Sequence, residues 1–221
     1  IWAASGFSNN FVLALDDFYE AYQPRSRYWA SQEIRPGLRA NVVTSLRNYI
    51  VQASAHFHKE YQTGKKEPAF AKAKLWYERY LLDYQAYSRK DNMHFLYGEL
   101  LSQHGNHADA LAHYEYAAYD GDIIVNKDAA YASILMTTKL HQGSSDARLK
   151  NDYLKKLVNY SHSYVQLYPG DARSIAVMSH AAEEAYREGM SQQAADLTEP
   201  YSDTPYTEAT YNLHSIKAHI Y

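Results

Sequence analysis

The sequence predicts an all-α fold built from short antiparallel helices, and three observations support this. Apolar residues recur at three- and four-residue spacing along most of the chain, as on one face of a helix. The 6 Pro and 9 Gly residues fall mainly between these periodic runs. No run combines apolar–polar alternation with β-branched residues and a hairpin turn, so no sheet is expected. Because the intervening segments are mostly short, neighbouring helices should lie antiparallel.

The periodic runs give ten expected helices, and proline and glycine delimit those in the first half of the chain. Pro24 should close the first helix and Gly64 the second. Pro68 suits the first turn of the third helix, where its missing N–H is not needed. Gly105 should separate the fourth helix from the fifth. The expected helices span 9–22, 37–62, 68–84, 91–104, 107–120, 126–142, 146–168, 171–189, 191–201 and 205–221.

Helix starts in the second half are marked by aspartates. Asp146 follows "GSS" and Asp171 follows "YPG", and a carboxylate at either place could accept the free amides of a first helical turn. Both aspartates are therefore predicted to be N-caps. Pro169 should end the helix that precedes Asp171.

Composition and charge exclude several classes of protein. Hydrophobic residues make up 46% and charged residues 21%, which is typical of a globular chain. The net charge is −3 and the 22 Lys and Arg residues are scattered, so we expect no nucleic-acid partner. No apolar run reaches the roughly 18 residues of a membrane span. Without cysteine there is no disulfide, thiolate metal site or thiol nucleophile.

Tyrosine is unusually abundant, with 23 Tyr against 6 Phe and 3 Trp. A tyrosine can bury its ring while its hydroxyl reaches water or a polar partner. This suits thin two-layer structures whose core lies close to solvent. The same abundance leaves open a second interpretation, a groove lined by tyrosine rings.

Residues 91–122 contain the clearest repeat. Small and large residues occur there at fixed spacing, namely Tyr97, Gly98, Leu101, Ala110, Tyr114 and Ala117. This spacing resembles the tetratricopeptide repeat, a helix-turn-helix unit of about 34 residues. The resemblance implies that Gly98 and Ala110 face each other across the helix pair. His94 and Asp122 depart from the family pattern, which prefers Trp and Pro at these places.

Weaker copies of the pattern extend the resemblance to residues 67–221. They comprise Ala73, Tyr77 and Tyr80; Tyr131, Ala132, Leu135 and Pro169; and Ala182, Gly189 and Ala194. Since one hairpin cannot bury its apolar stripe alone, the resemblance implies stacked repeats forming a right-handed superhelical solenoid. Residues 1–66 would then be divergent or capping helices.

The chain is expected to be part of a longer protein. Its start, "IWAASGFSNN", has neither an initiator Met nor the pattern of a signal peptide. The last helix, 205–221, lacks a second helix to complete its repeat, so the final repeat is expected to be truncated. Tyr211, Leu213 and Ile216 should then need cover from residues beyond the sequence.

Two segments are also similar to parts of large repeat proteins of bacterial cell envelopes. They are "AKLWYERYLLDYQ" and "HYEYAAYDGD". Such proteins use solenoids as docking platforms in secretion and outer-membrane assembly. The resemblance implies a scaffold or adaptor located in the periplasm or at the outer membrane, and it brings no catalytic residue with it.

No motif of enzymatic chemistry is evident, so we expect a non-catalytic protein without metal or cofactor. There is no G-x-S-x-G elbow, phosphate-binding glycine loop or H-E-x-x-H helix. His56 and His58 point about 200° apart on a helix and cannot easily share an ion. His104 and His107 could converge at a turn, but spacing supplies no third ligand. The adjacent carboxylates of Asp16–Asp17 and Glu183–Glu184 diverge, unlike an acid/base pair across a cleft.

The remaining candidate site is the concave face that the family geometry assigns to the first helix of each repeat. Polar residues interleaved with Phe95, Met136 and Tyr186 suit a protein or peptide held by hydrogen bonds and a few apolar anchors. The alternative function is a carbohydrate-handling solenoid whose exposed tyrosines stack on sugars. The candidate binding residues are Asn92, Phe95, Glu99, Ser102, Gln103, Ser133, Met136, Thr137, Ser179, Glu183, Tyr186 and Arg187.

Overall fold

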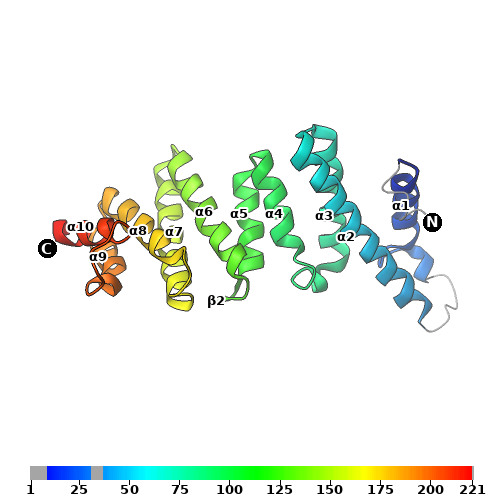
Figure 1. The fold of residues 1–221 in the computed structure, drawn as a ribbon. Coiled ribbons are helices and arrows are strands. Elements are labelled where there is room, and N and C mark those ends of the chain that lie inside the picture. Colours follow the sequence, from blue (N-terminus) through cyan, green and yellow to red (C-terminus); the bar gives the residue numbers. More distant parts are fainter. Residues whose placement is uncertain (1–8, 31–36, 221) are drawn as a thin grey trace. The chain divides into compact units, whose positions relative to one another are not determined.

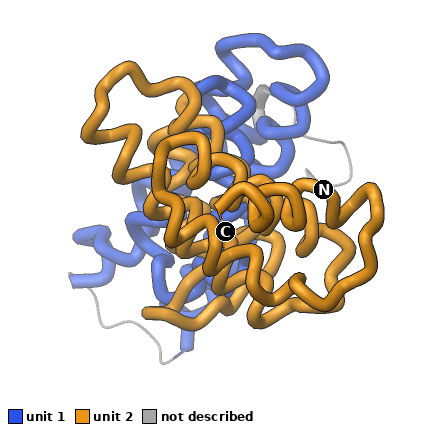
Figure 2. Tube along the Cα trace, turned by 90° about the vertical axis from the view of Figure 1, so that its left-hand side faces the viewer, with its two compact units in different colours: residues 1–105 blue, residues 106–221 orange. Residues whose placement is uncertain are grey.

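The computed structural model describes residues 9–30 and 37–220. Helices account for 79% of these residues, and the described chain contains ten α-helices, which confirms the predicted all-α class. Each helix packs mainly against its neighbours in sequence (Figure 1). The chain divides into two compact units, residues 1–105 and 106–221 (Figure 2).

In the first unit, the described residues form four α-helices and two short 3-10 helices. The helices α2 and α3 make the most extensive contact, α1 packs on α2, and α4 packs on α3. The elements are α1 (Asn9–Tyr22), η2 (Arg27–Ala30), α2 (Leu38–Gly64), α3 (Glu67–Tyr84), η3 (Gln85–Tyr87) and α4 (Met93–His104).

In the second unit each helix packs against the next, and α10 contacts both α8 and α9. Two strands of two residues each follow α5, the first helix of this unit. The elements are α5 (His107–Ala118), β1 (Tyr119–Asp120), β2 (Ile123–Ile124), α6 (Lys127–Gly143), α7 (Ala147–Leu167), α8 (Ser174–Arg187), α9 (Ser191–Thr198), η4 (Glu199–Tyr201) and α10 (Tyr211–Ile220).

Several predicted helix ends are confirmed. Pro68 lies in the first turn of α3. Asp146 is the N-cap of α7, where its carboxylate accepts hydrogen bonds from the amides of Arg148 and Leu149. Gly105 follows α4 with a left-handed φ of 96°, a conformation that glycine adopts without steric cost.

Two predicted helix starts are wrong because local side-chain bonds hold the chain in turns. Asp171 does not cap α8, which begins at Ser174; its carboxylate instead accepts hydrogen bonds from the amide and guanidinium of Arg173. The last helix begins at Tyr211 rather than at residue 205. Ahead of it, the Thr210 hydroxyl donates to the carbonyl of Pro205 at 2.8 Å. Such bonds compete with helix formation.

The absence of a sheet was also predicted wrongly, because α5 ends at Ala118 and a small hairpin follows. Tyr119 pairs with Ile124 and Asp120 with Ile123 in antiparallel register. Gly121 turns the chain with a φ of 61°. With only two residues per strand, the hairpin has no alternating pattern that the sequence could display.

Buried tyrosines contribute to both cores, mainly to that of the first unit. Trp76, Tyr77 and Tyr80 are among the large, fully buried side chains of the first unit, and Tyr164 is one of those in the second. Three tyrosines donate their hydroxyls to carboxylates from other segments of the chain, while the rings of Tyr19 and Tyr80 are buried and that of Tyr160 is half-buried. Tyr19 donates to Asp83 at 2.6 Å, Tyr160 donates to Glu115 at 2.7 Å, and Tyr80 donates to Asp91. Burial, followed by the carboxylate, raises the pKa of each of these three phenols.

The last helix does have cover within the chain, contrary to expectation. Leu213 and Ile216 are buried, and α10 packs on α8 and α9. Only Tyr211 of the three expected residues is exposed. The predicted boundary between residues 66 and 67 separates expected capping helices from expected repeats, and it stays a prediction. It falls between α2 and α3, the pair of helices with the most extensive contact.

Candidate functional site

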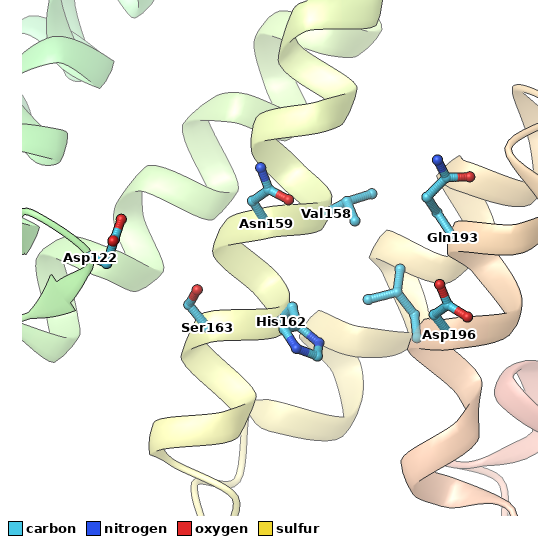
Figure 3. Close-up of a pocket in the computed structure, with 8 residues that line it drawn as sticks. Asp122, Val158, Asn159, His162, Ser163, Gln193 and Asp196 are labelled. Carbon is cyan, nitrogen blue, oxygen red and sulfur yellow. The ribbon is translucent and has the colours of Figure 1, made fainter.

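An open cavity of about 450 Å³ lies along α7 in the second unit. Figure 3 shows its lining: Asp122 comes from the turn between β1 and β2, the middle of the lining from α7, and the opposite side from α9. The lining residues are Asp122, Val158, Asn159, His162, Ser163, Gln193, Asp196 and Leu197.

The amphipathic pattern of α7 determines which of its side chains reach this cavity. Leu154, Leu157 and Tyr164 are buried against neighbouring helices. At three- and four-residue spacing from one another, Asn159, His162 and Gln166 are exposed on the other side of the helix. The apolar stripe therefore fixes α7 in the core and presents a row of polar side chains.

The two flanking elements are held by their own contacts with α7, since both β2 and α9 pack on it. Asp122 follows Gly121 in the hairpin turn and is exposed. On α9, Ala194 and Leu197 are buried, which leaves Asp196 on the exposed side of a short helix. Both carboxylates are thus positioned by packed elements.

The cavity is acidic, because Asp122 and Asp196 are among the described residues that line it and no Lys or Arg is. Within the described residues, Asp122 has no hydrogen bond or ion pair through its carboxylate. Asp196 accepts one hydrogen bond, from the Gln192 side chain at 2.8 Å, and no cation. The Nε2 atom of His162 accepts a hydrogen bond from the Gln166 side-chain amide at 2.8 Å, which leaves its Nδ1 without a hydrogen bond in the described chain. The negative charge of the lining is therefore uncompensated.

A second cavity, of about 380 Å³, adjoins the first and shares Asp122 and Ser163 with it. Its other lining residues are Ile123, Ile124, Gln166 and Leu167. Ile123 is 67% exposed and Leu167 52% exposed, which is unusual for aliphatic side chains that lie near each other. We call the two cavities together the α7 groove; it is polar at one end and aliphatic at the other.

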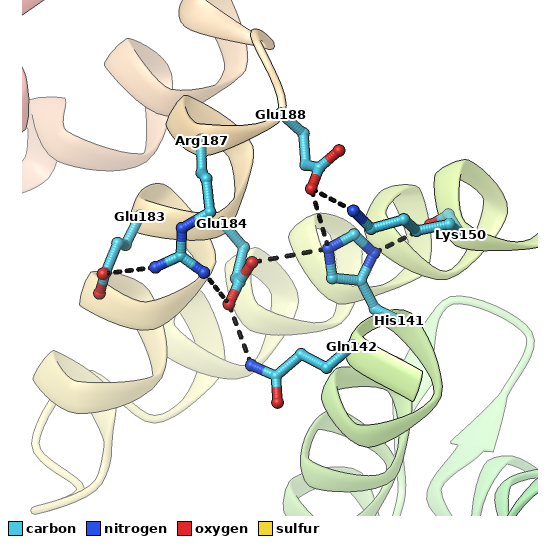
Figure 4. Close-up of polar contacts among 7 residues, drawn as sticks. All are labelled: His141, Gln142, Lys150, Glu183, Glu184, Arg187 and Glu188. Atoms are coloured by element: carbon cyan, nitrogen blue, oxygen red, sulfur yellow. Dashed lines mark hydrogen bonds and ion pairs between the residues drawn. The ribbon is translucent and has the colours of Figure 1, made fainter. Parts of the chain in front are cut away.

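A network of charged residues connects α6, α7 and α8 in the same unit (Figure 4). The ring of His141 is 1% exposed, and its Nδ1 donates to the carbonyl of Lys150 at 3.0 Å. Its Nε2 lies 3.5 Å from Glu184 and 3.9 Å from Glu188. Glu184, 3% exposed, also accepts hydrogen bonds from Gln142 and Arg187. Because neither His141 nor Glu184 is accessible, we assign this network to packing rather than to chemistry on a substrate.

Four of the residues predicted to bind a partner are buried and do not lie on an accessible surface. They are Ser133, Met136, Thr137 and Ser179. The reason is visible at Ser133, whose hydroxyl donates to the Ala129 carbonyl of its own helix at 2.9 Å. A small polar side chain satisfied in this way can be buried at low cost. Polarity alone was therefore a poor guide to the exposed face of α6.

The other eight predicted residues are at least partly accessible, and none lines the α7 groove. Asn92 precedes α4, which carries half-buried Phe95, Glu99, Ser102 and Gln103. On α8, Glu183 is half-buried, Tyr186 and Arg187 are exposed, and Arg187 donates to Glu183 at 2.8 Å. Their role in binding stays a prediction.

The residues of the α7 groove were missed by sequence reasoning. In the sequence, Asp122 is distinctive only because it replaces the proline that usually closes the repeat. The periodicity of 146–168 does separate the polar side of the helix from the apolar side. It does not indicate that a hairpin and α9 flank that polar side.

The described residues contain no group of three or more His, Asp or Glu side chains placed to hold a metal ion. His104 lies 3.0 Å from Glu67, and His58 lies 3.0 Å from the Tyr77 hydroxyl. Among the helices in the described ranges, none is both long enough and apolar enough to cross a membrane.

No protein-family model, no curated protein and no solved structure matches the chain.

Proposed function

We propose that the protein is a non-catalytic scaffold that binds a peptide segment of a partner protein in the α7 groove. The observation that carries this proposal is the continuity of the two cavities, which share Asp122 and Ser163 and join a polar to an aliphatic surface. Extended peptides bind in surfaces of this kind, where hydrogen bonds fix the backbone and apolar pockets take selected side chains.

The same proposal includes a fold of tetratricopeptide-like hairpins stacked as a right-handed superhelical solenoid. Support comes from the α8–α9 pair, whose helices are packed together and joined at Gly189 with a left-handed φ of 79°. Ala182 and Ala194, the small residues of this weak repeat, are both 0% exposed. Small buried residues allow helices to approach closely, as the repeat requires.

The location in the bacterial periplasm or at the outer membrane is also part of the proposal. It rests on the resemblance of two segments to envelope repeat proteins. Protein docking is the role such solenoids have in that compartment.

Carbohydrate binding is the second candidate function, and one aromatic cluster favours it. Tyr206 is 66% and Tyr211 51% exposed, and their ring centroids lie 5.7 Å apart. His214 stacks on Tyr206 at 5.3 Å. The two tyrosine rings meet edge to face, at 81°, and within the described residues no third tyrosine ring packs on them. Two exposed rings form a smaller platform than the roughly three tyrosine rings, exposed together on one face, that stacking on sugars would need.

Site-specific photo-crosslinking tests peptide binding. A photoreactive amino acid at Asn159, in the lining of the groove, should capture one defined segment of a partner in cells. The same residue at Lys139, exposed on α6 outside the groove, is the matched control. Ser163→Trp should fill the groove and abolish capture at Asn159. Equal capture at both positions, or capture unaffected by Ser163→Trp, would contradict the proposal.

A further inference from the structure

We propose that the segment bound in the α7 groove carries a lysine or arginine that pairs with Asp122 or Asp196, next to an aliphatic side chain. This inference rests on the proposed function and specifies the chemistry of the partner. The aliphatic side chain would pack against Ile123 and Leu167 at the other end of the groove. Three features of the lining support it.

The first feature is charge. Several acidic residues elsewhere in the second unit are neutralised by a cation of the chain itself. Glu115 pairs with Lys156 at 2.7 Å, and Glu199 pairs with Lys217 at 2.8 Å. Asp122 and Asp196, in contrast, line one cavity without an ion pair in the described residues. Figure 3 shows them on opposite sides of the α7 side chains, so a cation of the bound segment would pair with one of them while the other keeps the cavity negative.

The second feature is unused hydrogen-bonding capacity between the two aspartates. Within the described chain, the side-chain amides of Asn159 and Gln193 form no hydrogen bond, although both line the cavity. Each amide offers a donor and an acceptor, which is what the backbone of an extended peptide requires. A small inorganic cation would leave these groups and the aliphatic end unused.

The third feature is the aliphatic end. Ile123 projects from the hairpin, and Leu167 is the last residue of α7; both are largely exposed. Exposed aliphatic side chains beside a polar groove favour a partner that covers them, since burying apolar surface stabilises the complex. Phosphate-rich ligands fit poorly, because the uncompensated aspartates would repel them.

The test uses three fluorescent nine-residue peptides of identical sequence except at the central position. That position is Lys, Gln or Glu, with a leucine on either side, and binding to the whole chain is measured by fluorescence anisotropy. The lysine peptide should bind roughly tenfold more tightly than the glutamine peptide, as expected for one charge-assisted hydrogen bond. The glutamate peptide should bind more weakly than both.

Charge-neutralising variants locate the interaction. Asp122→Asn or Asp196→Asn, whichever removes the carboxylate that binds the lysine, should abolish most of the preference for lysine while leaving the glutamine peptide unaffected. The control is Asp152→Asn, which removes an exposed charge from α7 outside the groove and should change nothing. If the lysine preference survives both groove variants, or is lost equally in the control, the inference is wrong.

The remaining outcomes separate this inference from the proposed function. Equal binding of all three peptides would overturn the basic partner and leave peptide binding in place. Failure of all three at about 1 mM, a very weak affinity, with crosslinking at Asn159 still observed, would likewise overturn only the inference. Failure of both binding and crosslinking would overturn the proposed function as well.

Discussion

His58 on α2 is a buried histidine that we expect to stay neutral in the folded protein. The residue is 5% exposed, and its Nδ1 lies 3.0 Å from the Tyr77 hydroxyl. Burial, with a smaller contribution from the Lys65 cation, lowers its pKa to about 4 from an ordinary value of 6.5. Charging the ring would place an imidazolium among packed aromatic side chains.

This lowered pKa gives a pH dependence of stability with a defined sign. Between pH 6.5 and about 4, the unfolded chain binds a proton at His58 more readily than the folded chain does. The stabilisation is therefore complete above pH 6.5 and is lost as the pH falls through this window. The free energy of unfolding of the natural chain should fall between pH 7 and pH 4.5. For His58→Gln this fall should be smaller by roughly 1–2 kcal/mol, after allowance for solvent screening.

Urea unfolding at a series of pH values measures this difference. His219→Gln is the matched control, because His219 is exposed on α10. The prediction fails if the two variants show the same dependence of unfolding free energy on pH.

The network around Glu184 joins α8 to α6 at the scale of helix elements. Glu183 and Glu184 are adjacent on α8, yet their side chains are 44% and 3% exposed. Glu184 accepts hydrogen bonds from Gln142 on α6 and Arg187 on α8, and lies 3.5 Å from His141. Glu183 accepts from Arg187 at the surface. The two carboxylates should therefore differ in their contribution to stability.

Glu184→Gln should destabilise the protein by about 2–4 kcal/mol, since the new amide cannot accept from all the donors that face it and His141 loses a buried partner. Glu183→Gln should cost less than about 1 kcal/mol, as is usual for exposed ion pairs. Thermal unfolding of both variants provides the comparison. Similar midpoints would show that the network does not join the helices energetically.

The elements predicted well from sequence are those with a local cause at their ends. Pro68 and Asp146 mark the starts of α3 and α7 through backbone chemistry that does not depend on the rest of the fold. Asp171 has the same chemistry but satisfies Arg173 in a turn. The β1–β2 hairpin was missed because two residues per strand display no alternating pattern; β1 contacts α5 and β2 contacts α7.

The α7 groove could be predicted only in part, for a similar reason. The polar side of α7 follows from periodicity, which is local information. That Asp122 and Asp196 flank it depends on contacts of β2 and α9 with α7, between residues far apart in sequence. Burial of Ser133 also required knowledge of which side of α6 meets its neighbours.

At the scale of the whole molecule, helices that pack mainly with sequence neighbours should transmit a local disturbance only over a short distance. Ala182 on α8 is 0% exposed, so Ala182→Leu should overpack its surroundings at a cost of about 1–3 kcal/mol. Amides of α8, α9 and α10 should then exchange with solvent faster. Amides of α2 and α3, in the other compact unit, should keep their protection.

Hydrogen exchange followed by mass spectrometry resolves this pattern along the chain. Ala176→Leu makes the same chemical change at an exposed position of α8 and should leave all protection within the range of the natural protein. Because nearest-neighbour stability is a property of repeat arrays, this experiment also bears on the proposed solenoid. A uniform loss of protection in both units after Ala182→Leu would mean that the chain unfolds as one cooperative body, and stacked hairpins would no longer describe its energetics.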